Sequence, residues 1–212
     1  TKKMGISFLA QNAGKKSLTL NLKSKKGKVI FHKLVKKSDV VVENFRPGVM
    51  KRLGLDYEAL KKLNSQLIYC AISGFGQTGP MSPRPAYDQI IQGISGIMSI
   101  TGHEKKSPLR VGSPLADTIG GLTAAMAISA ALNKNPRGQM IDVSMLDSVL
   151  TTMGWVVSNY LIGGILPTPQ GNENMTSAPS GTFQTKKGLI NIAANEEKQW
   201  QSLIKHLGCQ YL

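Results

Sequence analysis

The sequence has 212 residues, of which 41% are hydrophobic, and this is enough to bury a substantial core in one or two domains. Its 26 Lys and Arg residues outnumber its 12 Asp and Glu residues and give a net charge of +14. The two cysteines form neither a metal-binding pattern nor a disulfide framework, and no stretch has the pattern of a secretory signal or a membrane span. We therefore expect a cytoplasmic protein with no membrane association and no bound metal.

The basic character is concentrated in residues 1–37, which contain eleven lysines and no acid. The rest of the chain, with 15 basic and 12 acidic residues, is close to balance. Three interpretations stay open for this segment: a solvated lysine-rich face, a nucleic-acid patch, or a site for a small polyanion. Few aromatic side chains are present for base stacking, so we expect no nucleic-acid partner.

Hydrophobic patterning alternates between strand and helix periods along the chain. The β-branched run that ends at Val42 is typical of a buried strand in a parallel sheet. Pro47 suits the first turn of a helix that Gly54 would end, and Asp56 can cap the next helix. This alternation predicts an α/β fold with a largely parallel sheet. The predicted strands span residues 16–22, 39–43 and 67–73, with a further strand leading into a helix around Asp147 and a hairpin of residues 181–185 and 189–194; the predicted helices span 27–37, 47–54, 57–63, 86–100, 117–132 and 196–207.

Two stretches follow predicted parallel strands, at the sheet edge where open α/β proteins bind ligands. In the first, residues 43–48 (ENFRPG), Asn44 is suited to hydrogen-bond a base or ribose and Phe45 to flank an adenine. The second, residues 73–85 (SGFGQTGPMSPRP), has enough glycine to approach a substrate with its backbone. The alternatives are a helix cap without a ligand and an ordinary surface loop.

Asp147 lies about one turn into an apolar helix, and its local sequence allows two roles. The acid either interacts with the positive end of the helix macrodipole on a solvated face, or points into a cleft as a nucleophile or base. The neighbouring residues do not distinguish these roles.

Taken together, these stretches resemble the class III CoA-transferases of the formyl-CoA transferase and carnitine CoA-transferase type. The resemblance runs in order across nearly the whole chain, and members of that family are about twice as long, so it implies a fragment. It also implies a Rossmann-like large domain at 1–166 with its N-terminal part missing, a linker loop at 167–180, and the start of a smaller α+β domain at 181–212. The matching stretches are residues 12–17 (NAGKKS), 39–55 (DVVVENFRPGVMKRLGL), 67–80 (LIYCAISGFGQTGP), Tyr87-Asp88, Asp117 and 138–149 (GQMIDVSMLDSV).

Site residues follow from the resemblance position by position. Asp147 falls on the family's catalytic aspartate, and Tyr87 on an active-site tyrosine. Pro85 stands where formyl-type members have a lysine, for which Arg84 is a possible substitute, and residues 172–181 lack a glycine run, which argues against formate and oxalate as substrates. The positions that fall on CoA contacts are Leu20, Asn21, Leu22, Lys23, Asn44, Phe45, Arg46, Arg52, Pro85, Ala86, Tyr87 and Asp88.

The resemblance implies transfer of CoA from an acyl-CoA donor to a carboxylic acid, for example a dicarboxylate such as succinate, through an aspartyl anhydride and an aspartyl-CoA thioester. CoA is then a substrate and not a permanently bound cofactor. An interlocked homodimer is also implied, and the apolar helices 86–100 and 117–132 suit a large buried interface. Two alternatives remain. One is an acyl-CoA racemase of the same superfamily, disfavoured because no histidine stands at a motif position. The other is a non-enzymatic polyanion- or nucleic-acid-binding module built on residues 1–37.

Overall fold

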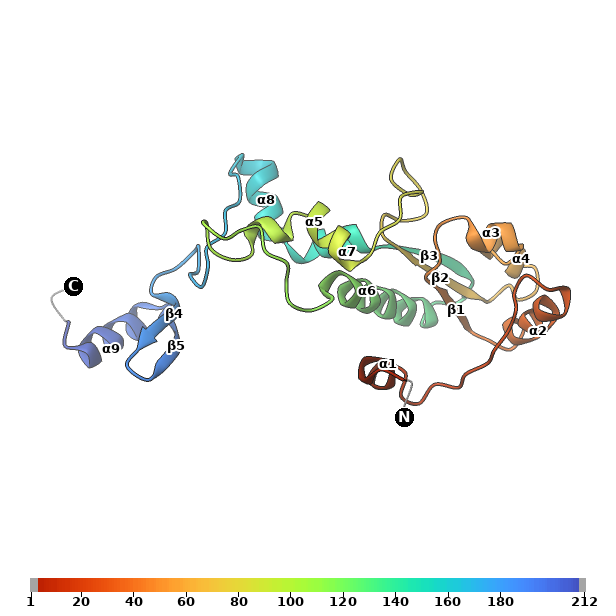
Figure 1. The fold of residues 1–212 in the computed structure, drawn as a ribbon, viewed down its shortest axis with the longest axis horizontal. Helices are drawn as coiled ribbons and strands as arrows, with labels where there is room; N and C mark the ends of the chain where they lie inside the picture. The colour runs from red at the N-terminus through yellow and green to blue at the C-terminus, as the bar shows by residue number, and fades with distance from the viewer. Residues whose placement is uncertain (1–3, 210–212) are drawn as a thin grey trace.

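A three-stranded parallel sheet organises the protein, whose computed structural model describes residues 4–209 (Figure 1). The strands β1 (Val40–Glu43), β2 (Ile68–Ser73) and β3 (Gln139–Ser144) lie in the order β1-β2-β3. The register pairs Glu43 with Ala71 and Ser73 with Ser144, so the carboxyl ends of all three strands meet at one edge. This confirms the predicted α/β fold with a parallel sheet.

Helices cover both faces of this sheet, and a separate hairpin follows it. The hairpin consists of β4 (Ser180–Thr185) and β5 (Gly188–Ala193). Together with helix α9 (Glu197–Leu207), it lies at the opposite end of the molecule from α2 (Lys25–Val35), α3 (Val49–Leu53) and α4 (Tyr57–Leu60) (Figure 1). The helices are α1 (Ile6–Gln11), α2 (Lys25–Val35), α3 (Val49–Leu53), α4 (Tyr57–Leu60), α5 (Asp88–Ile94), α6 (Leu115–Leu132), α7 (Met145–Thr152), α8 (Gly154–Gly163) and α9 (Glu197–Leu207), with a short 3-10 helix η1 (Ile97–Ile100).

The alternation of side chains along β2 builds the core on both sides of the sheet. Tyr69 and Ala71 pack with Val35 of α2 and Leu60 of α4 on one face. Cys70 points to the other face and packs with residues of α6 and β3. All three of these β2 residues are buried, as expected for a central strand covered on both faces.

Local signals placed several elements correctly. The Asp56 side chain accepts a hydrogen bond from the backbone N–H of Ala59 at 3.3 Å and so caps α4, as predicted. Gly54 ends α3 in the left-handed region at φ +68°. Helix α4 is shorter than predicted and ends at Leu60.

Two predicted elements are wrong. Residues 16–22 form no strand, because alternation gives a strand only where a neighbouring strand accepts its hydrogen bonds, and here the chain turns into α2 instead. At that turn the carbonyl of Asn21 accepts from the backbone N–H and the hydroxyl of Ser24. The predicted helix 86–100 is broken into α5 and η1, because the chain turns at Gly96, where φ is +84°.

Helix α6 is the longest helix in the described residues and the most uniformly apolar of those that touch the sheet. By length and composition alone it is able to cross a membrane, a test that core helices also pass. Its contacts with β2, β3, α5 and α7 account for the apolar residues that it buries, which are 22% of the helix. Gly120 lies close to α7, since a Cβ at this position would lie 3.1 Å from the Met145 side chain. Helix α6 therefore belongs to the α/β core, with its first turn at the sheet's carboxyl edge.

Candidate functional site

A cavity of about 770 Å³ opens at the carboxyl edge of the sheet, where open α/β proteins bind ligands. It is bounded by the ends of β1 and β2, by the glycine-rich loop after β2, and by the beginnings of α6 and α7. The residues that line it are Gln11, Lys15, Asn44, Phe45, Arg46, Pro47, Ile72, Ser73, Gly74, Arg84, Pro85, Ala86, Tyr87, Asp117, Gly121 and Met145.

Three hydrogen bonds hold the turn after β1 beside the cavity. Asn44 donates from Nδ2 to the carbonyl of Ile72 on the neighbouring strand at 2.8 Å. Glu43 is buried and accepts from the backbone N–H of Phe45 at 2.6 Å and from the Tyr69 hydroxyl at 3.3 Å. Burial raises the pKa of the Glu43 carboxyl, although these two hydrogen bonds lower it. The side chains of Glu43 and Asn44 therefore hold the turn, and Phe45 and Arg46 are exposed at the cavity.

The glycine-rich loop 73–85 returns close to its own beginning, where its first glycine lies against Ala86. A Cβ on Gly74 would lie 2.4 Å from the Cβ of Ala86, so only glycine allows the loop to return to the cavity wall. Further along, Gln77 donates its backbone N–H to the Asp142 carboxylate of β3 at 2.9 Å. The loop is thus tied to the sheet at one point and carries Arg84 and Pro85 to the cavity.

Asp117 is the carboxylate that this cavity contains. It lies in the first turn of α6, and Gly121, one turn later on the same face, also lines the cavity and has open space where a side chain would stand. Burial raises the pKa of the Asp117 carboxyl, and the negative charge of Asp88 raises it further. The Asp117 side chain is itself exposed, as expected for a group that faces an open cavity. The nearby second carboxylate and the partial burial together give it the character of a reactive group.

Asp147, the aspartate favoured from the sequence, does not line this cavity. Met145 does, and Asp147 lies two residues later, about 200° further round α7. The Asp147 side chain is exposed, and its backbone N–H donates to the Ser144 hydroxyl at 3.2 Å. This is the arrangement of a first-turn acid in a capped helix, the other of the two roles that the sequence allowed.

The other predicted contacts divide into two groups. Asn44, Phe45, Arg46, Pro85, Ala86 and Tyr87 line the cavity, whereas Leu20, Asn21, Leu22, Lys23, Arg52 and Asp88 do not. Residues 20–23 lead into α2, and Arg52 lies over Gly48 at the start of α3. Asp88 lies behind the cavity wall, where its carboxylate accepts from the backbone N–H of Ala116 at 2.8 Å.

Lys15 and Ser73 line the cavity but were not singled out from the sequence. Lys15 is one of many lysines in its segment, so no local signal distinguished it. Ser73 ends β2 with only 5% of its surface exposed, and its hydroxyl has no hydrogen-bond partner among the described residues. A buried hydroxyl of this kind is available to a ligand.

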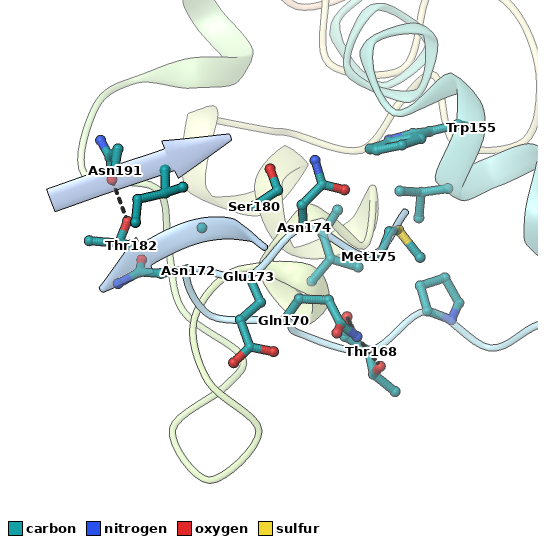
Figure 2. A pocket seen from close by; sticks show the side chains of 15 residues that line it. Trp155, Thr168, Gln170, Asn172, Glu173, Asn174, Met175, Ser180, Thr182 and Asn191 are labelled. Atoms are coloured by element: carbon teal, nitrogen blue, oxygen red, sulfur yellow. Dashed lines mark hydrogen bonds between the residues drawn. The ribbon is translucent and has the colours of Figure 1, made fainter. Parts of the chain in front are cut away.

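A second cavity, of about 490 Å³, lies between α8 and the C-terminal hairpin (Figure 2). Trp155 and Met175 contribute apolar surface, and most of the polar lining consists of amides and hydroxyls. Thr182 and Asn191 are hydrogen-bonded to each other at 2.6 Å. Among the described residues that line it, Glu173 is the only charged one. This cavity therefore lacks the cations that a polyanion needs.

The sequence profile of CoA-transferase family III matches residues 1–212. The chain belongs to that family. A solved CAIB/BAIF family protein from Brucella suis has a TM-score of 0.83 and 39% identity, covering 95% of this chain and 54% of that one.

Among curated relatives, the succinate–glutarate CoA-transferase of Agrobacterium fabrum is 40% identical over 204 residues, 95% of this chain and 51% of the relative. The acetyl-CoA:oxalate CoA-transferase of Acetobacter aceti is 41% identical over 211 residues, 98% of this chain and 54% of the relative. The chain thus spans about half the length of these CoA-transferases, as the resemblance implied.

Proposed function

We propose that the protein transfers CoA from an acyl-CoA donor to a carboxylic acid, with Asp117 as the covalent nucleophile. The observation that carries this proposal is the single carboxylate in a cavity at the carboxyl edge of the sheet, lined also by the Asn44-Phe45-Arg46 turn. Membership of CoA-transferase family III supports the reaction class. Cavity geometry supports Asp117 in place of Asp147.

The charges around the cavity suit a CoA ester. Lys15, Arg46 and Arg84 line it, and CoA carries a pyrophosphate and a further phosphate that such cations bind. Phe45 and Tyr87 are exposed aromatic side chains on the same lining. A flat adenine can pack against such rings while its phosphates meet the cations.

In the proposed mechanism, the Asp117 carboxylate attacks the thioester carbonyl of the donor, and CoA leaves as a thiolate. The thiolate attacks the aspartyl carbonyl of the mixed anhydride, which releases the donor acid and leaves an aspartyl-CoA thioester. The acceptor carboxylate then attacks the aspartyl-CoA thioester, which releases the CoA thiolate and forms a second mixed anhydride. The thiolate attacks the acceptor's carbonyl in this anhydride, which forms the new CoA ester and frees the Asp117 carboxylate. Each step exchanges one acyl bond for another, so one difficult transfer is divided into easier ones.

Short dicarboxylates are the acceptor class that we propose. Relatives at 40% and 41% identity act, by their names, on succinate and glutarate and on oxalate. The second of these weakens the sequence argument against oxalate, because that argument depended on a missing glycine run in residues 172–181. Glutarate and oxalate therefore both belong in the assay as acceptors.

The alternatives receive less support. An acyl-CoA racemase needs a proton donor and acceptor, commonly including histidine, and no histidine is among the residues that line the cavity. His103 packs against Gly171 on a different part of the chain. A nucleic-acid-binding module gains no specific support, because most lysines of residues 15–37 lie on exposed surface away from the cavity.

We further propose that the complete protein is a cytoplasmic homodimer. Large apolar side chains are exposed on α6, where Leu122 is 66% and Met126 is 71% exposed, and on α8, where Ile162 is 88% exposed. Leu122 and Met126 lie one turn apart on the same face of α6, and exposed apolar surface of this kind is typical of an interface. Either a second copy or the rest of a longer chain covers these apolar side chains. The oligomeric state of the complete protein distinguishes the two.

The test of the proposed function is CoA exchange by the complete protein. Succinyl-CoA is incubated with glutarate, oxalate, formate and acetate, and new CoA esters are detected by mass spectrometry. We expect esters of the dicarboxylates to form first. Thermal stabilisation by desulfo-CoA, compared with an oligonucleotide of equal charge, separates a CoA site from a general polyanion site. Stabilisation by the oligonucleotide alone, with no CoA exchange, would contradict the proposal.

A further inference from the structure

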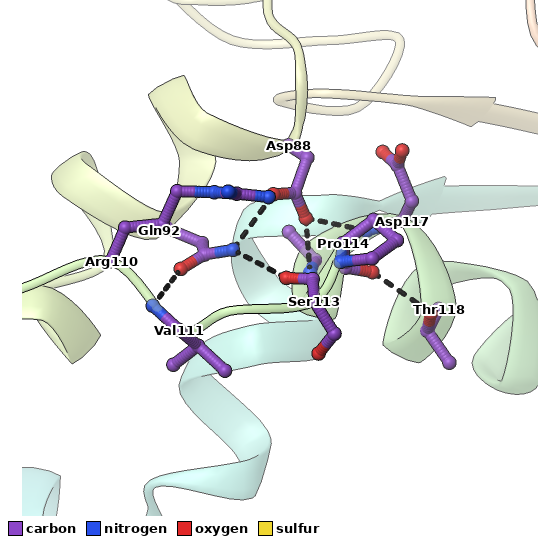
Figure 3. Close-up of polar contacts among 9 residues, drawn as sticks. Asp88, Gln92, Arg110, Val111, Ser113, Pro114, Asp117 and Thr118 are labelled. Atoms are coloured by element: carbon purple, nitrogen blue, oxygen red, sulfur yellow. Dashed lines mark hydrogen bonds and ion pairs between the residues drawn. The ribbon is translucent and has the colours of Figure 1, made fainter. Parts of the chain in front are cut away.

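Gln92 of α5 is fully buried, although glutamine is seldom found inside a protein. Its amide makes three hydrogen bonds (Figure 3). Nε2 donates to the Asp88 carboxylate at 2.7 Å and to the carbonyl of Ser113 at 3.2 Å, and Oε1 accepts from the backbone N–H of Val111 at 2.9 Å. A methionine would fill the same volume without the cost of burying an amide. The amide therefore joins α5 to the segment 111–113, which leads into α6.

The start of α6 depends on another element for its cap. Its N-cap residue, Pro114, makes no side-chain cap hydrogen bond. Asp88 on α5 supplies the cap, because its Oδ1 accepts from the backbone N–H of Ala116 at 2.8 Å and lies 3.4 Å from that of Asp117. The exposed guanidinium of Arg110 lies 3.8 Å from the other oxygen of Asp88. Figure 3 shows the Asp117 carboxylate standing clear of this network.

We propose that Gln92 is a positioning residue for the Asp117 carboxylate. This inference rests on the proposed function, in which Asp117 is the nucleophile. Gln92 holds the Asp88 carboxylate on one side and the 111–113 segment on the other. Asp88 in turn holds the backbone of the first turn of α6, so the direction of the Asp117 side chain depends on an amide that does not line the cavity.

Two properties of Asp117 depend on the network. The first is its place, because a nucleophile displaced by about 1 Å can lose about a hundredfold in rate. The second is its charge environment, since Asp88 adds to the raised pKa of the Asp117 carboxyl. Arg110 faces Asp88 from the connecting segment, and Lys15, Arg46 and Arg84 line the cavity that Asp117 faces. A loosened Asp88 would alter both properties of the nucleophile.

The matched control is Asn64, which also makes three hydrogen bonds through its amide. Its Nδ2 donates to the carbonyls of Val35 at 3.2 Å and Ser38 at 2.9 Å, and its Oδ1 accepts from the backbone N–H of Gln66 at 3.1 Å. These bonds join α2 to the start of β2, and Asn64 does not line the cavity. Gln92→Met and Asn64→Leu therefore remove equivalent sets of hydrogen bonds, one beside the nucleophile and one distant from it.

The experiment measures the first-turnover rate of hydroxylamine-trapped adduct at residue 117, per folded molecule of complete protein, with succinyl-CoA as donor. For Gln92→Met we expect the rate to fall at least about tenfold, with desulfo-CoA affinity within about threefold of the parent. Backbone amides of Ala116 and Asp117 should exchange their hydrogens faster than in the parent. Asn64→Leu should lower the melting temperature without changing either measurement. If Gln92→Met does not fold, Gln92→Glu replaces it with the same expected rate loss, because it keeps an acceptor for Val111 and places a second carboxyl group against Asp88 in place of the amide donor.

A Gln92 variant that forms adduct within about twofold of the parent rate, with unchanged exchange at Ala116 and Asp117, overturns the inference and leaves Gln92 as a packing residue. Failure of the proposed function gives a different result. In that case the parent protein itself forms no adduct at Asp117, and the positioning role falls with it.

Discussion

Helices α6 and α7 begin side by side at the same edge of the sheet, and each carries an aspartate in its first turn. They differ in the origin of the cap. Helix α7 is capped locally, by Ser144, and Asp147 stands on its exposed side. Helix α6 is capped by Asp88 from α5, and Asp117 faces the cavity. A first-turn acid is therefore a candidate nucleophile because of its tertiary surroundings and not because of its place in a helix.

Replacing each aspartate by asparagine should give the largest difference between the two helices, in the rate of CoA transfer. Asp117→Asn should lower CoA transfer by at least about a thousandfold, because an amide is not a nucleophile toward a thioester. Asp147→Asn should leave the rate within about threefold. Both are measured by steady-state CoA exchange on the complete protein, with desulfo-CoA binding as the control for an intact site. Full activity in Asp117→Asn would reverse the assignment of the two residues.

The two adjacent glycines of α6 separate its packed face from its open face. Gly120→Leu should destabilise the protein by about 1–3 kcal/mol, because even a Cβ there lies 3.1 Å from Met145 of α7. Gly121→Leu meets open space and should not lower stability, but its side chain enters the cavity and should weaken desulfo-CoA binding by about tenfold. Urea unfolding and ligand titration of both variants provide the measurements, and equal binding in Gly121→Leu would argue against this cavity as the CoA site.

Removing the cap of α7 is expected to affect stability alone. Ser144→Ala deletes the hydroxyl that accepts from the backbone N–H of Asp147 and should cost about 1 kcal/mol. CoA transfer per folded molecule should not change, because Asp147 has no part in the proposed chemistry. Denaturant unfolding and the exchange assay are run on the same preparation. A loss of activity larger than the loss of folded protein would argue that Asp147 takes part in the reaction.

The smallest expected effects are changes in stability, which should have opposite signs in Asp117→Asn and Asp147→Asn. The raised pKa of Asp117 means that its folded state holds a proton more tightly than the unfolded state, so its ionised form costs stability above that pKa. Asp117→Asn should therefore raise the melting temperature slightly at neutral pH, and this gain should vanish below the ordinary aspartate pKa of 3.8. Asp147→Asn loses a favourable helix-dipole interaction and should lower stability by about 0.3–1 kcal/mol. Melting curves at several pH values distinguish the two, and a loss of stability in Asp117→Asn would argue that the folded protein stabilises the ionised carboxylate.

Much of the fold could be predicted because its signals are local. The valine run of β1, the Asp56 cap and the Gly54 helix end each depend on neighbours within a few residues. The sheet edge then gathered Asn44 and Tyr87 into one cavity, as the parallel arrangement predicted. The family resemblance supplied the reaction class and the expected length.

The choice between Asp117 and Asp147 could not be made locally, because both residues lie in the first turn of an apolar helix. The deciding contact joins Asp88 to Ala116, which are 28 residues apart. The failed strand at 16–22 has a similar cause, since its alternation gives no information on whether a neighbouring strand is present. The absence of the strand and the proposal of Asp117 both depend on long-range contacts and not on residue patterns.

The most direct test of the central claim is to find which carboxylate carries the acyl group during turnover. The complete protein is incubated with succinyl-CoA, quenched with hydroxylamine, digested, and sequenced by mass spectrometry, so that an activated aspartate is marked as a hydroxamate. We predict the mark on Asp117 and an unmodified Asp147. A hydroxamate on Asp147 with none on Asp117 would contradict the account.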